Sequence, residues 1–393
     1  MSLDTALIHD LENLREQNLL RKLRRVDSPQ SPHIQIDGKK YLNFSSNDYL
    51  GLANHPALKE AAVHAVEKFG AGSGASRLVS GSLAPFHDLE TALAQFKRTG
   101  AALTFSTGYA AAQGVIGALL GRDDIIILDK LVHACIVDAS KLSGAKIRVF
   151  AHNDLDGLEK KLRWSASFRN AFSKSRVLVV TESIFSMDGD AAPLREIVAL
   201  KQKYGAWLMV DEAHATGILG KHGRGLADHT GLSSEIEIQM GTLGKALGAA
   251  GGFICGSRPL IDVLINRARP FIFSTAPVPA AAAAAAAGVR LVQSADGEKL
   301  RHKLQTNIAE FLSALGKHRD EVPAAIIPIM LGEESKAIKA AEALLAQNIF
   351  VPAIRYPTVA RGAARLRVTL TAAHTPNDIS RLVNALKSID IGL

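Results

Sequence analysis

The chain has 393 residues, of which 47% are hydrophobic and 21% are charged, and its formal net charge is +8. This balance is typical of a soluble globular protein, and no apolar run reaches the ~20 residues that a membrane-spanning helix needs. No basic run is interleaved with aromatic residues, so we expect no nucleic-acid binding. The basic excess either favours a phosphate-bearing or acidic partner or only aids solubility. Because 393 residues are more than a single hydrophobic core usually organises, we expect a large and a small domain.

The N-terminus and the cysteines indicate a cytoplasmic protein. The first residues contain no apolar signal core, and acidic side chains argue against a transit peptide, namely Asp4, Asp10, Glu12 and Glu16. Cys135 and Cys255 form no Cys-x-x-Cys pair and are too few for a disulfide framework. We therefore expect both to be small buried residues in a reducing compartment.

The N-terminal residues predict an amphipathic helix followed by a hairpin. Leucines recur at near-helical spacing with charges between them, at Leu3, Leu7, Leu11, Leu14 and Leu23. This helix would dock on the body of the chain or on a second subunit. Cations that would suit the dipole at its C-terminal end follow, namely Arg21, Lys22, Arg24 and Arg25. Ser28–Pro32 would end the helix, and Asp37-Gly38 marks the hairpin turn.

Apolar runs that alternate with helical stretches predict βαβ units and a mostly parallel sheet. The runs are Leu103–Ser106, Asp124–Leu128, Ile147–Phe150, Val177–Val180 and Trp207–Val210. The last two end in polar clusters, Thr181-Glu182-Ser183 and Asp211-Glu212-Ala213-His214. Open α/β sheets place ligand chemistry at the carboxyl ends of their strands, so these clusters are candidate site residues.

A lysine among glycines follows, in the stretch Gly241-Thr242-Leu243-Gly244-Lys245-Ala246-Leu247-Gly248. Alone it fits a surface lysine in a flexible turn equally well, and it lacks the spacing of a phosphate-binding P-loop. A lysine in an apolar pocket, however, loses solvation of its charged form, and its neutral amine can form a Schiff base. Pyridoxal 5′-phosphate (PLP) needs such a lysine and a carboxylate for its pyridine nitrogen, which Asp211 could provide.

The C-terminal third predicts a second domain. Pro279 followed by Ala280–Ala287 favours a close-packed linker helix. Strands are expected after it, at Ile326–Leu331, Ile349–Ile354 and Leu366–Leu370. The last helix would begin at Thr375-Pro376, with Thr375 as its cap and Asp378 at the third helical position.

Motifs from about residue 20 to the C-terminus resemble, in the same order, those of the α-oxoamine synthases, a family of PLP-dependent enzymes. They are Asn43–Leu52, Gly72–Arg77, Ser183–Asp190, Asp211–His214, Gly241–Gly248 and Arg365–His374. The resemblance implies an α/β protein with the PLP-dependent transferase fold of type I. It would have a large domain with a mostly parallel seven-stranded sheet and a smaller α+β C-terminal domain. The expected boundaries are 1–45 for the N-terminal helix and hairpin, 46–287 for the large domain and 288–393 for the small one.

The same resemblance assigns residues to the cofactor ring. Lys245 would hold PLP as a Schiff base and act as general base, and Asp211 would pair with the pyridine nitrogen. His214 would hydrogen-bond the ring O3′, and His133 would stack on the ring and face the substrate. Two further residues would lie near the ring and substrate, Glu182 and Ser186.

A second group would hold the cofactor phosphate. The helix expected at Ala110–Leu120 offers free N–H groups at its start, next to Gly108 and Tyr109. Thr242 would contribute as well, and Ser274 and Thr275 would reach the phosphate from the partner subunit of a homodimer with shared sites. Where the family usually has Asn, this chain has Ala112, which removes one polar contact near the phosphate.

For the substrate, the resemblance implies that Arg355 binds the amino-acid carboxylate, with Arg21, Asn47 and Thr358 nearby. Within the family, the chain is most similar to the member that condenses L-alanine with pimeloyl-CoA, or pimeloyl-acyl carrier protein, in biotin biosynthesis. Glycine C-acetyltransferase and 5-aminolevulinate synthase share the key residues and stay open as alternatives. A binding or scaffold protein on an inherited fold, without PLP, is the alternative from another class.

Overall fold

A computed structural model describes residues 2–171, 175–317 and 324–389. The chain forms two compact units, each assembled from separate stretches of sequence. The small unit comprises Met1–Asn47, Met187–Gly189 and Lys303–Leu393, and the large unit comprises Asp48–Ser186 and Asp190–His302. The N-terminal residues thus share a unit with the C-terminal ones.

The large unit contains the seven-stranded sheet. In sheet order its strands are β3 (Ala101–Phe105), β9 (Gly252–Gly256), β8 (Ile238–Thr242), β7 (Trp207–Asp211), β6 (Val177–Glu182), β4 (Ile125–Asp129) and β5 (Lys146–Phe150). Only β9 is antiparallel to its neighbours, β3 and β8. The other strands therefore run in one direction, which confirms the expected α/β fold with a mostly parallel sheet.

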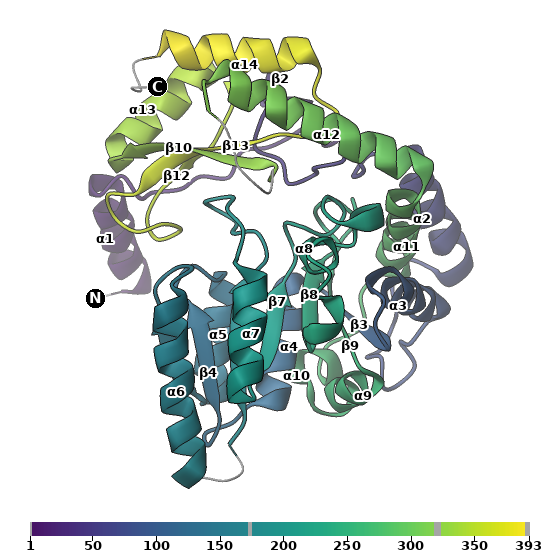
Figure 1. The fold of residues 1–393 in the computed structure, drawn as a ribbon. Coiled ribbons are helices and arrows are strands. Elements are labelled where there is room, and N and C mark those ends of the chain that lie inside the picture. Colours follow the sequence, from purple (N-terminus) through teal and green to yellow (C-terminus); the bar gives the residue numbers. More distant parts are fainter. Residues whose placement is uncertain (1, 172–174, 318–323, 390–393) are drawn as a thin grey trace. The chain divides into compact units, whose positions relative to one another are not determined.

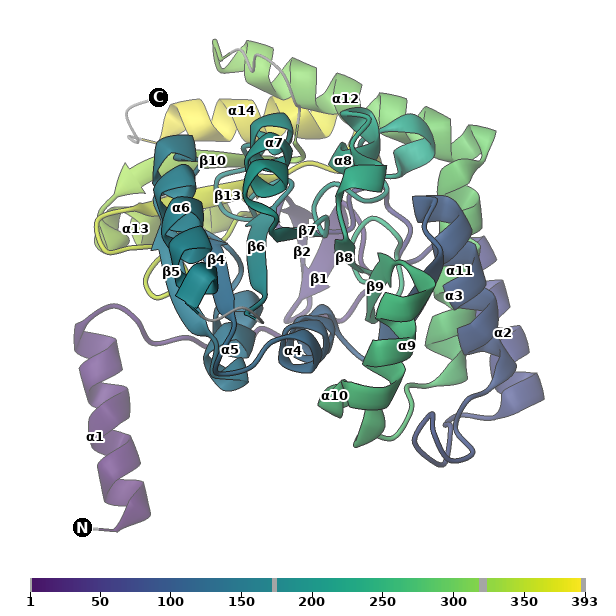
Figure 2. The same ribbon diagram turned by 60° about the horizontal axis from the view of Figure 1, so that its bottom comes forward.

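Helices cover both faces of this sheet (Figures 1 and 2). One face carries α4 (Gly108–Leu119), α5 (Ala134–Ser143), α9 (Arg258–Arg267) and α10 (Arg269–Ile272). The other carries α6 (Leu155–Ala171) and α7 (Leu194–Tyr204). Because both faces are covered, every residue of β4 and β6 is buried. Short helices lie in the connections: α8 (Leu226–His229), η1 (Lys221–Gly223) and η2 (Ser233–Glu235).

The alanine-rich run forms α11 (Pro279–Gln293), which packs on α2 (Pro56–Phe69) and α3 (Ala84–Lys97). Its small side chains allow this close approach. At Gly288 an added Cβ would lie 2.3 Å from the Leu247 carbonyl oxygen, so only glycine fits there. The structure places α11 within the large unit, and the boundary at residue 303 falls later, inside α12 (Ala295–Ala314).

The small unit has two three-stranded sheets. In the first, β1 (His33–Ile36) and β2 (Lys39–Asn43) form the expected hairpin, with φ of 47° at Asp37 and 78° at Gly38, as a type I′ turn requires. β11 (Ile349–Phe350) adds to β2 in parallel. The second has the order β10 (Ile326–Gly332), β13 (Ala364–Thr369) and β12 (Ala353–Ile354).

A single strand over Ile349–Ile354 was therefore the wrong expectation. Residues Ile349 and Phe350 pair with β2, whereas Ala353 and Ile354 pair with β13 in the other sheet. Pro352 lies between the two pairs and has no N–H to donate to a continuous ladder.

Helices α13 (Glu334–Ala346) and α14 (Pro376–Ser388) complete the small unit. The predicted start of α14 is confirmed. Thr375 and Asp378 form a reciprocal capping box, and Pro376 occupies the first turn. The buried face of α14 includes Leu382 and Leu386. Among the described residues, none of the helices is long and apolar enough to cross a membrane.

The N-terminal helix is shorter than its leucine spacing predicted. α1 covers Leu3–Glu16 and is capped by Ser2, and Asn18 leaves it with a φ of 57°. Leu23 and the four cations expected at its C-terminal end lie beyond it, so their proposed interaction with the helix dipole is wrong. No residue of α1 is buried. Its leucines are therefore exposed within this single chain.

Candidate active site

The candidate site lies at the edge of the large sheet where its parallel strands end. β6 and β7 place Glu182 and Asp211 side by side, because these two residues are register partners. Asp211 is also the partner of Met240 on β8, two residues before Thr242. The segments that follow these strands carry the remaining polar groups, as expected for an open α/β sheet.

A hydrogen-bonded chain connects Lys245 to Tyr49 through His214. Lys245 Nζ lies 2.8 Å from His214 Nε2, and His214 Nδ1 lies 2.6 Å from the Tyr49 hydroxyl. An ammonium group has only donors, so when Lys245 is charged, Nε2 accepts from it and Nδ1 donates to Tyr49. His214 is 6% exposed and Tyr49 is fully buried, so the phenol fixes the imidazole from inside the protein.

Asp211 and Glu182 form a buried pair of carboxyl groups. Burial raises the pKa of Asp211, and the charge of Lys245 together with the Ala213 N–H, 2.9 Å from Oδ1, opposes the rise. Burial, and then the charge of Asp211, raise the pKa of Glu182 well above its ordinary value. Two carboxyl groups in one dry site are stabilised by an added cation. A protonated pyridine nitrogen would supply that charge at Asp211.

His133 precedes α5 and is held as a neutral imidazole. Its Nδ1 accepts a hydrogen bond from the Cys135 N–H at 3.2 Å, which leaves the ring proton on Nε2. Burial lowers the pKa of His133, which favours the same neutral form. A neutral ring suits the stacking role that the motifs imply. Burial also raises the pKa of the Cys135 thiol to about 12, and both cysteines are buried and unpaired, as expected.

The start of α4 meets the end of β8. A Cβ added to Gly108 would lie 3.9 Å from Cβ of Thr242, so the two predicted phosphate residues are neighbours. The Thr242 hydroxyl donates to the Gly251 carbonyl at 3.0 Å and accepts from the Gly244 N–H at 3.3 Å. The first N–H groups of α4 have no intrahelical acceptor, so this corner fits an anion.

Other predicted phosphate residues differ in their surroundings. Tyr109 is 41% exposed, and its hydroxyl donates to Asp138, which raises the pKa of the phenol. Ala112 is fully buried in the hydrophobic core beneath α4. An asparagine there would have to bring a polar group into that core. Ser186, which was expected near the ring and substrate and not at the phosphate, is half-buried in the segment after β6.

Ser274 and Thr275 lie between α10 and α11. Thr275 pairs with Ser76 in an isolated antiparallel bridge, and the Ala276 N–H donates to the Ala75 carbonyl at 2.9 Å. These contacts bind the segment to the glycine-rich motif Gly72–Arg77. Thr275 is exposed and Ser274 half-buried in this single chain.

In the small unit, the structure brings three predicted substrate residues together. Arg21 Nη2 lies 3.3 Å from Thr358 Oγ1, and Arg355 Nη2 donates to the Leu20 carbonyl at 2.9 Å. Burial and then the charge of Arg21 lower the pKa of Arg355. The buried Nε of Arg355 has no hydrogen-bond partner among the described residues. Two adjacent guanidinium groups with an unsatisfied donor suit a carboxylate ligand.

Asn47, the remaining predicted substrate residue, is held by a buried arginine of the small unit. Both terminal nitrogens of Arg367 donate to Asn47 Oδ1, at 3.1 and 3.2 Å. Arg365, two residues earlier on β13, pairs with Asp188 at 2.6 Å. The motif Arg365–His374 therefore contributes positioning contacts.

Sequence reasoning assigned no role to Tyr49, although it lies inside a quoted motif. The signal was present, because Tyr49 follows Ser45, Ser46, Asn47 and Asp48 in a stretch rich in polar side chains. Lys97 was missed as well, and Glu212 was named only as a member of the Asp211–His214 cluster, without a partner. Their contact joins residues 115 positions apart, which no local pattern reveals.

Comparisons with known proteins agree with this geometry. A family model described as aminotransferase class I and II matches residues 39–386. The 8-amino-7-oxononanoate synthase of Geobacter sulfurreducens is 48% identical over 387 residues, covering 98% of this chain and 97% of that protein. The chain belongs to the 8-amino-7-oxononanoate synthase family. This confirms the resemblance found in the motifs.

Solved structures support the same family. A serine palmitoyltransferase from S. paucimobilis, solved with PLP bound, is 31% identical with a TM-score of 0.90, covering 99% of this chain and 98% of that chain. An 8-amino-7-oxononanoate synthase from Francisella tularensis is 28% identical with a TM-score of 0.75, covering 88% of this chain and 97% of that one. The similarity thus extends over nearly the whole fold.

Proposed function

We propose that the chain condenses L-alanine with a pimeloyl thioester, carried by CoA or by an acyl carrier protein. The products would be 8-amino-7-oxononanoate, CO₂ and the free thiol, as in biotin biosynthesis. The observation that carries the proposal is the contact of Lys245 with His214 beside the buried Asp211, at the carboxyl edge of the sheet. The 48% identity to a synthase of that name supports the specific reaction.

The residues of the large unit fit PLP. Lys245 would hold it covalently through Nζ, Asp211 would pair with its ring nitrogen, and His133 would lie against the ring. Gly108 and Thr242 would contact its phosphate. When bound, PLP withdraws the electron pair that is left on the amino acid when Cα loses a proton or CO₂.

Lys245 also has a proton to move. Once its amine is released by the incoming alanine, Nζ can accept the Cα proton and later return it to the product. His214 lies within hydrogen-bond distance of Nζ, and Tyr49 holds the orientation of His214. The amine therefore keeps a fixed partner throughout the exchange of protons.

The substrate carboxylate would be bound by Arg355. Its Nη2 is already fixed by Leu20, and the partnerless Nε remains as a donor for a carboxylate oxygen. Arg21 adds a second positive charge, and Thr358 adds a hydroxyl. Asn47 is oriented by Arg367 and would complete the group that faces the substrate.

We further propose that the working form is a homodimer whose phosphate pockets use Ser274 and Thr275 of the partner chain. Phe273 beside them is 70% exposed, and the α1 leucines are exposed as well, with Leu3 at 74%. Exposed apolar side chains of this kind are typical of surfaces that a second chain covers.

The test is to mix purified protein with PLP, one amino acid and one acyl thioester and to measure thiol release. Alanine with pimeloyl-CoA or pimeloyl-carrier protein should give the fastest release. Glycine with acetyl-CoA or succinyl-CoA would reveal the alternative activities instead. Lys245→Ala serves as the blank and should lose several powers of ten in rate. No release with any pair, from protein that holds PLP, would overturn the proposal.

A further inference from the structure

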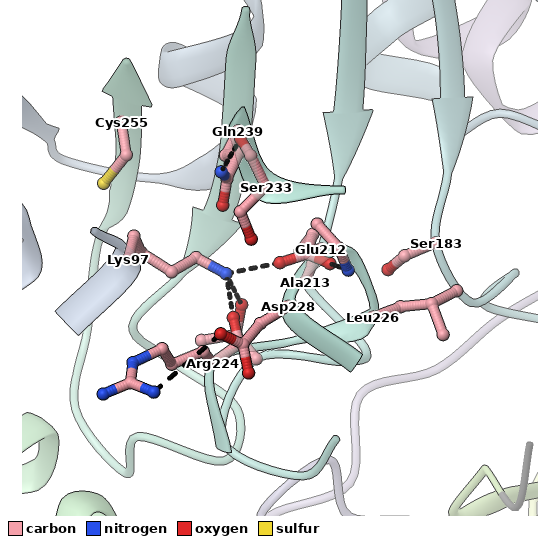
Figure 3. Close-up of polar contacts among 12 residues, drawn as sticks. Lys97, Ser183, Glu212, Ala213, Arg224, Leu226, Asp228, Ser233, Gln239 and Cys255 are labelled. Atoms are coloured by element: carbon pink, nitrogen blue, oxygen red, sulfur yellow. Dashed lines mark hydrogen bonds and ion pairs between the residues drawn. The ribbon is translucent and has the colours of Figure 1, made fainter. Parts of the chain in front are cut away.

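A fully buried lysine lies behind the turn that carries the site residues (Figure 3). Lys97 ends α3, and its side chain is 0% exposed. Its Nζ donates to the Glu212 carboxylate, to the Arg224 carbonyl and to Thr216 Oγ1, the last at 3.2 Å. An ammonium group has three protons to donate, and each of them has an acceptor here.

Glu212 is equally buried and joins several segments. One carboxylate oxygen binds Lys97, and the other accepts the Ala227 N–H at 2.8 Å. Its backbone N–H donates to the Met240 carbonyl of β8 at 2.8 Å. Its own carbonyl accepts the N–H of Thr216 at 2.8 Å and so closes the turn that contains His214.

The backbone of Asp211 is also fixed, by the neighbouring strand. Its carbonyl accepts two hydrogen bonds from Ser183, from the N–H at 2.9 Å and from the hydroxyl at 3.2 Å. Consecutive side chains at a strand end point to opposite sides, so Glu212 turns away from Asp211. Figure 3 shows Glu212 pointing toward Lys97. The ion pair therefore holds the turn from behind.

The segment after the turn fits closely around the same carboxylate. A Cβ added to Gly225, which has a φ of 119°, would lie 2.0 Å from Glu212 Oε2. Arg224, whose carbonyl binds Lys97, also lies 3.8 Å from Asp228. Little room exists for Glu212 to relax if Lys97 is removed.

We propose that Lys97 and Glu212 are positioning residues that set the orientation of Asp211 and His214 toward the cofactor. The pair acts through the turn, since neither side chain is among the groups that would touch PLP or substrate. This inference rests on the proposed PLP-dependent function. It predicts that losing the pair changes how the cofactor is held, beyond any loss of stability.

The chain offers a matched control at the opposite end of the same strands. Lys201 on α7 is 6% exposed and pairs with Glu237 at 2.6 Å. The other carboxylate oxygen of Glu237 accepts the Leu208 N–H near the start of β7, at 2.8 Å. Lys201→Met thus removes an ion pair between a buried lysine of α7 and the more exposed Glu237, which lies just before β8, without touching the turn.

The experiment compares Lys97→Met, Glu212→Gln and Lys201→Met with wild type, and adds Thr216→Val as a mild variant that should fold. For each, PLP affinity is measured by titrating the apoprotein, together with the visible circular dichroism per bound PLP and the melting temperature of the apoprotein. We expect Lys97→Met and Glu212→Gln to weaken PLP binding by about tenfold or more and to change the dichroism, and Thr216→Val to weaken it by about threefold.

Lys201→Met should lower the melting temperature but leave PLP affinity within about twofold and the dichroism unchanged. If Lys97→Met fails to fold, Glu212→Gln and Thr216→Val decide. The inference is overturned if these variants match Lys201→Met in both cofactor measurements. Wild-type protein that binds no PLP would instead refute the proposed function itself, so the two failures are distinguishable.

Discussion

At the scale of single residues, the site is defined by charges that are kept out of water. Asp211 and Glu182 are buried together, and the positive charge near them comes from Lys245. Such carboxyl groups bind a cationic ligand strongly, because little solvent is present to screen their charge. The small unit presents the complementary case, with Arg21 and Arg355 side by side and no carboxylate paired with either among the described ion pairs.

Asp211→Asn should keep PLP bound but remove most proton exchange at the alanine Cα. An amide has no negative charge to keep the ring nitrogen protonated, so electrons are no longer drawn from Cα. The measurement is loss of the Cα proton of alanine in D₂O without an acyl thioester, with PLP content determined in parallel. Exchange at the wild-type rate in the PLP-loaded variant would remove Asp211 from the role we give it.

Arg355→Ala should weaken alanine binding by about a hundredfold, since a carboxylate without its guanidinium partner costs ~3 kcal/mol. Arg355→Lys should recover only part of this, because a point charge cannot form the two parallel bonds of a guanidinium group. PLP binding should persist in both. Alanine affinity is read from the change in the cofactor absorbance.

Arg361→Ala is the matched control for this prediction. Arg361 belongs to the same segment, stacks on Tyr356 and bonds to Gln17. It should leave alanine affinity within about twofold. Equal effects of the Arg355 and Arg361 substitutions would show that the segment, and not the carboxylate contact, matters.

At the scale of elements, His152 ties the ends of neighbouring strands together. It follows β5, and its Nδ1 lies 3.0 Å from Asp129 at the end of β4. Its Nε2 lies 2.7 Å from Asp190, in the segment that follows β6. Burial alone would lower the pKa of His152, but the hydrogen bonds to Asp129 and Asp190 outweigh it and raise the pKa to about 10.

This raised pKa makes the free energy of unfolding depend on pH. The stabilisation is fully present below the unfolded pKa of 6.5 and is lost as pH rises through about 10. Between these values the folded chain binds one more proton, so stability falls by at most ~1.4 kcal/mol per pH unit. We expect His152→Gln to reduce this slope in urea unfolding followed by circular dichroism. An unchanged slope in His152→Gln would contradict the assignment.

At the scale of the whole molecule, one chain leaves apolar surface that a second copy would cover. We expect sedimentation to show a homodimer. The shared site can be tested by mixing Lys245→Ala with the double variant Ser274→Ala, Thr275→Ala, each poorly active alone. In a mixed dimer one site would combine the intact Lys245 of one chain with the intact Ser274 and Thr275 of the other. Random exchange should restore about a quarter of the wild-type sites. A fully active monomer, or no recovery from proven mixed dimers, would refute shared sites.

Features that depend on local spacing could be predicted from the amino-acid sequence. The polar clusters that follow two apolar runs predicted that Glu182, Asp211 and His214 lie at the carboxyl ends of strands. Such a prediction needs only the periodicity and the turn residues of a short stretch. The turn at Asp37-Gly38 and the cap at Thr375 were likewise predicted and found. The motifs and their order along the chain sufficed to identify the family, because the reaction requires particular residue types within each motif.

Contacts between distant segments could not be predicted from the sequence and became visible in the folded chain. It paired β11 with β2 and β12 with β13, where the sequence suggested one strand. It ended α1 at Glu16, because Asn18 takes a left-handed φ of 57° that no leucine spacing indicates. It also joined Lys97 to Glu212 across 115 residues. Such contacts depend on which side chains the folded chain buries and on which charges it brings together. Neither the burial nor the charge environment of a residue can be read from a short stretch of sequence.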